Sequence, residues 1–157
     1  MDIGLDAVDL RKWIFCRVGA RICAVPLACV AETMRALPVT PLADSAPFIS
    51  GASIIRGAPV PVVDGGALFG DPPSARRHLV TIDIRQRQVA LAVDEVLGAG
   101  EITENELREL PPLLREAATA AVHTIGVLDG EFLLCLEASR LIPDGELDGP
   151  RLTLPAA

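Results

Sequence analysis

Aromatic residues are scarce in this sequence: they make up 3% of its 157 residues, and tyrosine is absent. A core without rings has to be filled by valine, isoleucine, leucine and alanine. The surface also lacks the tyrosine and tryptophan anchors on which tight protein interfaces and base-stacking platforms often rely. This composition argues against recognition of nucleic acid by base stacking.

Positive charge is also scarce: 14 lysines and arginines stand against 21 aspartates and glutamates, so the formal net charge is −7. Proteins that neutralise phosphates along DNA, or that bind anionic lipid surfaces, carry the opposite sign. No uninterrupted apolar stretch reaches the ~18 residues of a membrane span. The first residues, MDIGLDAVDLRKW, carry acidic side chains where a secretory signal needs positive ones. We therefore expect a cytoplasmic protein with no nucleic acid partner and no direct membrane insertion.

The cysteines offer no metal or redox motif. The sequence contains no C-x-x-C pair and no histidine near a cysteine at metal-ligand spacing. Reduced, buried thiols are the expected state, and we predict neither a metal nor a cofactor. The four residues concerned are Cys16, Cys23, Cys29 and Cys135.

Acid, base and phosphate-binding motifs are equally weak. His78 and His123, the two histidines, have no obvious catalytic partner, and the acidic stretch from Asp94 to Glu109 is typical of a solvated face. Gly65-Gly66 lacks the lysine and hydroxyl residue of a phosphate-binding loop, so we expect an exposed turn there. No catalytic residue is assigned.

Strand signals dominate the rest of the chain. They are apolar and β-branched runs of about four to eight residues, bounded by glycine, proline, aspartate or short polar turns. Helical signals are few and short, at Pro26–Ala31, after Pro47, after Asp64, after Thr103 and at Glu137–Leu141. This pattern predicts an all-β fold with a few short helices, a barrel or a sandwich. The expected strands are 13–18, 21–25, 33–38, 52–55, 60–63, 79–84, 88–93, 122–128 and 131–136.

Two pairs of segments are similar to each other. CAVPLACVAE (23–32) matches LAVDEVLGAGE (91–101), and VPVVDGGALF (60–69) matches FLLCLEASRL (132–141). The similarity predicts two related subdomains of about half the chain each, although apolar strands also match by chance.

A longer set of motifs resembles the CheW family of chemosensory coupling proteins. The set comprises AVPLACVAE, PFISG, IIRGAPVPVVD, VALAVDEV and TIGVLDGEFLLCLEASRLI. The resemblance implies a CheW-like domain at 13–142, between an extension at 1–12 and a tail at 143–157. Within it, two intertwined, tandem five-stranded SH3-like β-barrels are expected, roughly at 13–70 and 78–142. Ile54, Cys23 and the placement of Pro47 depart from the usual family pattern.

By the same resemblance, the protein is a non-catalytic adaptor. One surface is expected to bind the cytoplasmic tip of a methyl-accepting chemoreceptor, and barrel ends to bind the regulatory domain of a CheA-type histidine kinase. An adaptor for a non-chemotactic pathway, such as surface motility, biofilm or second-messenger control, is an alternative. A small thiol enzyme using Cys23 or Cys135 with His123 is a further one.

Arg56 is the residue of most interest, since it stands alone inside an apolar run and precedes Gly57. The guanidinium can bind a receptor carboxylate at a rim, or pair with Glu32 or Asp64 to fix the turn. Val30 and Met34 are expected at helical spacing, with Val30 exposed and Met34 in the core. The receptor-binding residues implied by the resemblance are Val30, Glu32, Ile55, Arg56, Val93 and Val96.

Overall fold

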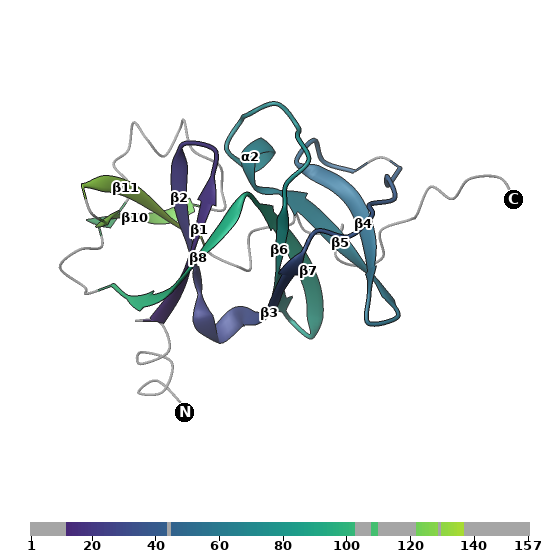
Figure 1. Ribbon diagram of the computed structural model, residues 1–157, viewed down its shortest axis with the longest axis horizontal. Helices are drawn as coiled ribbons and strands as arrows, with labels where there is room; N and C mark the ends of the chain where they lie inside the picture. Colours follow the sequence, from purple (N-terminus) through teal and green to yellow (C-terminus); the bar gives the residue numbers. More distant parts are fainter. Residues whose placement is uncertain (1–11, 44, 103–107, 110–121, 129, 137–157) are drawn as a thin grey trace, which may run out of the picture.

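The computed structural model describes residues 12–43, 45–102, 108–109, 122–128 and 130–136. Strands dominate them, as the sequence predicts (Figure 1). The two short helical segments are the 3-10 turn η1 (Leu27–Cys29) and α2 (Gly65–Leu68). The strands are β1 (Lys12–Val18), β2 (Arg21–Pro26), β3 (Val30–Arg35), β4 (Ile49–Ile55), β5 (Ala58–Asp64), β6 (His78–Ile84), β7 (Arg87–Val93), β8 (Glu95–Glu101), β9 (Arg108–Glu109), β10 (Val122–Leu128) and β11 (Glu131–Leu136).

Every expected strand is present, with ends shifted by a few residues. Two further strands, β8 and β9, lie in the stretch that was predicted to be a polar face. The helical turn expected after Asp64 is confirmed as α2, whereas the one expected at Pro26–Ala31 is shorter, because β3 already begins at Val30. The expected helices at 103 and 137, the tail and most of the amino-terminal extension lie outside the described residues.

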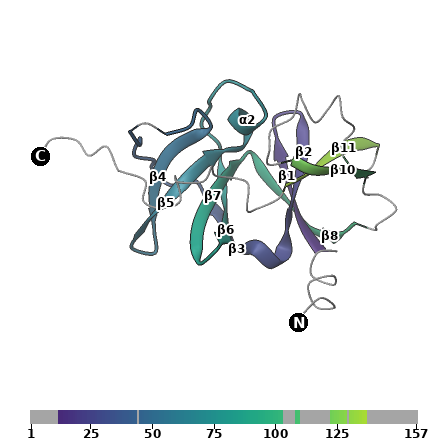
Figure 2. The ribbon, with the colours of Figure 1, turned by 180° about the vertical axis from the view of Figure 1, so that it is seen from behind.

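The strands form two sheets. Sheet A has the order β8-β1-β2-β11-β10-β9, and sheet B has the order β3-β6-β7-β5-β4. Neighbouring strands are antiparallel, except that β11 runs parallel to β2 and β5 runs parallel to β7. Figure 2 shows the two sheets side by side, with β1, β2, β8, β10 and β11 in one unit and β3 to β7 in the other.

Each sheet takes strands from both halves of the sequence. The order β8-β1-β2-β11-β10 in sheet A repeats β3-β6-β7-β5-β4 in sheet B, so β2–β3 is equivalent to β7–β8, and β5 to β11. Both internal similarities seen in the sequence fit this equivalence. The expected division into barrels at 13–70 and 78–142 does not match the two sheets. β3, from the first range, pairs with β6 in sheet B, and β8, from the second range, pairs with β1 in sheet A. Neither η1 nor Asp94 forms the tight reversal that would fold β3 or β8 back onto the preceding strand.

The core has three parts. A shared cluster lies between the sheets and includes Cys16, Val25, Ile82 and Val93. A second cluster belongs to sheet A and includes Trp13, and a third belongs to sheet B. Alternate residues of one strand therefore face different clusters, and both faces of the inner strands are buried. This double burial explains why these strands are continuous apolar runs.

Sheet B curls until its two edges approach each other. The segment after β3 forms an isolated bridge from Thr40 to Ala52 of β4, and Ser53 Oγ donates to the Pro38 carbonyl at 2.8 Å. The bridge covers one residue pair, and no ladder joins β3 to β4 among the described residues. The arrangement is consistent with an SH3-like barrel whose last edge is closed by a loop.

Charged residues tie the sheets together at the α2 end. Asp64, with 2% of its side chain exposed, accepts from the Gly66 amide at 2.9 Å and from Arg76 Nε at 3.1 Å. Arg76 Nη1 also donates to both oxygens of Asp94, 3.1 Å away, and Asp94 accepts from the Gly19 amide. The loop before β6 is thus anchored by a buried arginine.

The prediction of an exposed turn at Gly65-Gly66 is wrong, because both glycines are buried in α2. A Cβ on Gly65 would lie 2.6 Å from the Ala92 carbonyl oxygen, and one on Gly66 would overlap the Arg76 guanidinium. Glycine at these two positions allows the close approach of α2 to β7 and to Arg76.

Candidate functional site

Arg56 lies at the tip of the β4–β5 hairpin. Ile55 and Ala58 face each other, so Arg56 and Gly57 are the two loop residues, with φ of 51° and 79°. Positive φ at both positions is the mark of a type I′ turn, which matches the right-handed twist of the strands. The turn places Arg56 beyond the end of the strand with 78% of its side chain exposed.

The Arg56 guanidinium forms a two-bond ion pair with Glu32 of β3. Nε donates to Oε1 at 3.0 Å, and Nη2 donates to Oε2 at 2.5 Å. Hydrogen bonding to Arg56 lowers the pKa of the Glu32 carboxyl, so the carboxylate form persists to lower pH. Of the two intramolecular partners expected for Arg56, the structure selects Glu32, since Asp64 pairs with Arg76.

The backbone of Glu32 is held by a buried hydroxyl. Thr81 Oγ1 accepts from the Glu32 amide at 3.0 Å and donates to the Glu32 carbonyl at 3.2 Å. These bonds lie where the β3–β6 register shifts between Val30 and Glu32. Thr81 therefore fixes the position from which Glu32 reaches across to Arg56.

Val30 and Val96 are half-buried, and both pack against the core cluster that the two sheets share. Val30 is the first residue of β3 and Val96 the second residue of β8, and these are the equivalent edge strands of the two sheets. The predicted helical spacing of Val30 and Met34 is wrong, because both residues lie on a strand. Met34 is half-buried and packs against the sheet B cluster, so its predicted core position is confirmed only in part, and Val30 is half-buried where an exposed side chain was predicted.

Ile55 and Val93 are core residues. Their exposures are 4% and 0%, and they belong to the sheet B cluster and the shared cluster respectively. Both residues were expected to contact a receptor, and this prediction is wrong, because their side chains lie below the surface and can only support it. Two exposed apolar side chains were not predicted from the sequence: Ile54, two residues before Arg56 with 62% exposure, and Leu97 of β8 in sheet A with 42%.

A pocket of about 690 Å³ lies at the opposite, α2 end of sheet B. Its wall includes the exposed side chains of Leu37 and Val39, and core residues of sheet B such as Val62 lie at its base. Asp64 and Arg76 supply polar groups at one side. β5 spans both ends, and a rise of about 3.3 Å per residue places its ends about 20 Å apart.

The thiols are poorly placed for chemistry. Cys16, Cys23 and Cys135 are buried. A hydrogen bond with the Cys16 thiol, together with burial, raises the pKa of Cys23 well above its ordinary value, which disfavours the reactive thiolate. Within the described ranges, no three His, Cys, Asp or Glu side chains are grouped as metal ligands. The part of the chain that the structure describes contains no helix that is long and apolar enough to cross a bilayer.

The comparison with known families covers most of the chain, since the CheW-like domain matches residues 12–146. The chain belongs to the CheW-like domain family. The match takes in both sheets, η1, α2 and the Arg56 hairpin, and it agrees with the family resemblance of the sequence motifs.

Curated relatives agree with this assignment. The chain is 24% identical to chemotaxis protein CheW of Rhizobium meliloti (strain 1021) over 139 residues, 87% of this chain and 90% of that protein. It is 29% identical to chemotaxis protein CheA of Cereibacter sphaeroides over 143 residues, which are 84% of this chain but 19% of CheA. Scaffolding protein TtCheW from Thermoanaerobacter tengcongensis has the same fold, with a TM-score of 0.74, 22% identity and coverage of 86% and 89% of the two chains.

Proposed function

We propose that this protein is a non-catalytic cytoplasmic adaptor that couples the cytoplasmic tip of a chemoreceptor to the regulatory domain of a CheA-type histidine kinase. The family match over residues 12–146 carries the proposal. The similarity of the same stretch to about a fifth of a CheA chain supports the kinase as a partner, since two related domains can pair in a pseudo-symmetric way.

The receptor surface is proposed to contain Val30, Glu32, Arg56 and Val96. The Arg56–Glu32 pair offers fixed charges of both signs, and the two valines offer apolar contacts where the sheets meet. A receptor helix with an apolar stripe and a polar flank matches this chemistry. Ile55 and Val93 support the surface from the core, and Thr81 holds Glu32 in place.

The kinase surface is proposed to lie at the α2 end of sheet B. The pocket there, with Leu37 and Val39 exposed at its wall, is the kind of concave apolar site that a partner side chain fills. About 20 Å of β5 separates this end from Arg56. A receptor contact centred on Arg56 therefore leaves the pocket free for the kinase, as a coupling role requires, whereas Val96, two residues after Asp94, lies nearer the α2 end.

An adaptor transmits a signal only if its contacts differ between the states of its partner. A receptor that contacts the adaptor equally in both signalling states shifts no equilibrium in the kinase. The Arg56–Glu32 pair suits such a difference, because it lies at the surface and its two bonds can be shared with a partner carboxylate.

A coupled phosphorylation assay tests the proposed function. The CheA-type kinase of the same cell is incubated with receptor tip fragments, with and without this protein. Autophosphorylation that responds to the receptor only when the adaptor is present supports the proposal. An unchanged kinase rate, with the protein shown to be folded by circular dichroism, refutes it.

A further inference from the structure

The β6–β7 hairpin carries an unusual turn. Ile84 pairs with Arg87, so Arg85 and Gln86 are the loop residues, with φ of 47° and 68°. A turn of this type normally uses Asn-Gly or Gly-Gly, because both positions lie in the left-handed region. Neither loop residue is a glycine, in contrast to the Arg56-Gly57 turn.

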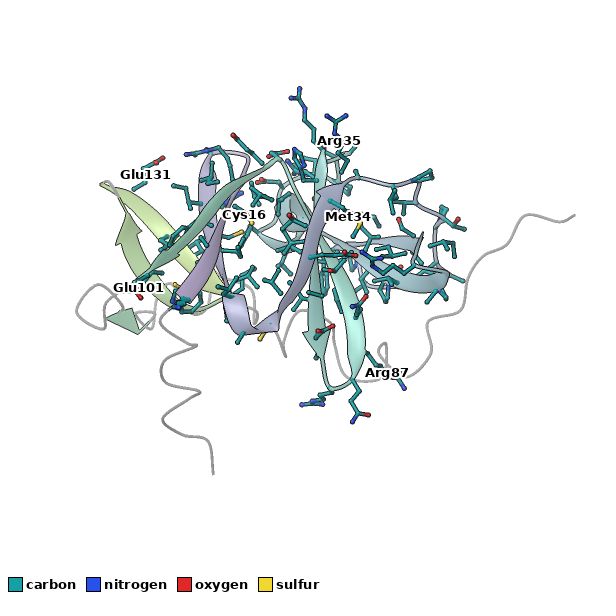
Figure 3. All side chains as sticks on the ribbon, turned by 60° about the horizontal axis from the view of Figure 1, so that its bottom comes forward. Cys16, Met34, Arg35, Arg87, Glu101 and Glu131 are labelled. Atoms are coloured by element: carbon teal, nitrogen blue, oxygen red, sulfur yellow. The ribbon has the colours of Figure 1, made fainter. Side chains whose placement is uncertain are left out.

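The strand order places this tip at the same end of sheet B as Arg56. β5 runs parallel to β7, and Val62 is level with Ala90. When this register is carried back along both strands, Ala58, directly after the Arg56-Gly57 turn, is level with Gln86. In Figure 3, Arg87 lies near the far tip of the β6–β7 hairpin, and Arg35 lies at the other end of the sheet.

The charge of the tip is opposite to that of the protein. Arg85 is exposed, and it makes no hydrogen bond or ion pair with the other residues that the structure describes. The nearby Asp83 accepts from Gln88 Nε2 at 3.1 Å. A protein with a net charge of −7 therefore presents, in a strained backbone position close to the highly exposed Arg56, a guanidinium that has no partner among the described residues. Strain of this kind is typical of positions where the side chain has a role in binding.

We propose that Arg85 is a second recognition residue, which binds acidic side chains on the receptor helix that contacts Arg56. This inference rests on the proposed function, because it assigns a further contact to the same partner. Two guanidinium groups at one end of the sheet fix the direction of an acidic helix better than one does. They also speed its encounter with the adaptor, an effect that salt weakens.

The matched pair Arg85→Glu and Arg35→Glu tests this inference. Both residues are exposed and both variants change the charge equally, but Arg35 lies at the opposite end of the sheet, next to His78. Each variant is titrated with the receptor tip fragment by calorimetry. In about 50 mM salt we expect Arg85→Glu to weaken binding about tenfold and Arg35→Glu less than about twofold. In about 300 mM salt the difference in receptor affinity between the two variants should become smaller.

Glycine variants separate recognition from backbone geometry. Arg85→Gly removes both the strain and the charge, so Tm is expected to rise by about 2 °C while receptor affinity falls several-fold. Gln86→Gly removes strain alone, and it should raise Tm with receptor affinity unchanged. If Gln86→Gly loses as much receptor affinity as Arg85→Gly does, the inference is overturned, because the geometry of the turn and not the guanidinium would then account for the loss.

The remaining outcomes are also decisive. If the wild-type protein binds the receptor tip and Arg85→Glu binds it as Arg35→Glu does, the inference fails and the proposed function stands. If the wild type binds no receptor tip, both the inference and the proposed function fail.

A separate experiment measures binding of the protein to vesicles with about 30% phosphatidylserine. If Arg85→Glu releases the protein from these vesicles without changing receptor affinity, the tip binds lipid and the inference is wrong.

Discussion

Arg56 and Glu32 join the opposite edges of sheet B. Glu32 lies on β3, the first strand of the sheet order, and Arg56 follows β4, the last. Their two hydrogen bonds, at 3.0 and 2.5 Å, cross the line where the curled sheet meets itself. The residue that is most exposed at the proposed receptor surface is therefore also part of the closure of a barrel.

Charge reversal at Arg56 is predicted to weaken receptor binding and to leave folding nearly intact. In Arg56→Glu two carboxylates face each other, but both side chains reach solvent, so the urea midpoint should change little. Calorimetry with the receptor tip and urea denaturation measure the two effects. Loss of folding would show that the pair is structural.

The charge swap Glu32→Arg with Arg56→Glu separates contact from geometry. The swap restores an ion pair between β3 and the hairpin, so the turn stays fixed, but each charge has moved. We expect receptor affinity to remain low, because the partner still meets charges in the wrong places. If the swap recovers wild-type affinity, Arg56 serves only to fix the turn.

Removal of the Arg76 guanidinium is predicted to destabilise the fold strongly. Arg76→Leu leaves Asp64, 2% exposed, without its cation, and breaking a buried ion pair costs about 3 kcal/mol. Arg77→Leu is the matched control, since Arg77 is exposed, and it should change stability by less than about 0.5 kcal/mol. Equal urea midpoints for the two variants would contradict this account.

Acid is predicted to destabilise the α2 end. Burial alone would raise the pKa of Asp94, but hydrogen bonds from the Gly19 amide and Arg76 outweigh burial and lower it. A hydrogen bond from Arg21 likewise lowers the pKa of Asp71. Because the folded pKa lies below the unfolded pKa of about 3.9, both groups stabilise the fold above that pH. That stability is lost as the pH falls further.

Thermal melts between about pH 2.5 and 7 measure this dependence. Asp94→Asn cannot titrate at this position, so its Tm should fall less steeply with acid than that of the wild type. Parallel Tm curves for the two proteins would show that Asp94 is not a source of the dependence.

The cysteines are predicted to react slowly with alkylating reagents at neutral pH. Three are buried, and the half-buried Cys29 has a pKa raised by burial and by Asp83. Cys29 should be labelled first, and the others only as fast as the protein opens. Rapid labelling of native Cys23 or Cys135 would favour the thiol-enzyme alternative. Mass spectrometry after iodoacetamide treatment identifies the labelled residue.

The strands could be predicted because most of them are buried on both faces. A strand such as β7 is a continuous apolar run, and its type follows from composition and flanking turns. β8 was missed since its half-buried positions alternate with exposed ones and include Gly98 and Gly100, which carry no side chain to signal a strand. Its exposed glutamates, Glu95 and Glu101, favoured the interpretation as a solvated face.

The exchange of β3 and β8 between sheets could not be read from the sequence. Local patterns show that a strand exists, but its neighbour depends on contacts far apart in the chain, such as Glu32 with Thr81. The candidate site was predicted in part for the same reason. Arg56 and Glu32 were correctly paired as one of two options, whereas Ile55 and Val93 are buried by strands that only the fold brings together.

The most direct test of the coupling role is a set of four calorimetric titrations. The protein is titrated with the regulatory domain of its CheA-type kinase, with the receptor tip fragment, and with each in the presence of saturating amounts of the other. The account predicts saturable binding to both partners, with neither displacing the other, because about 20 Å of β5 separates Arg56 from the pocket at the α2 end. Binding to neither partner by a folded protein, or mutual exclusion of the two, would contradict it.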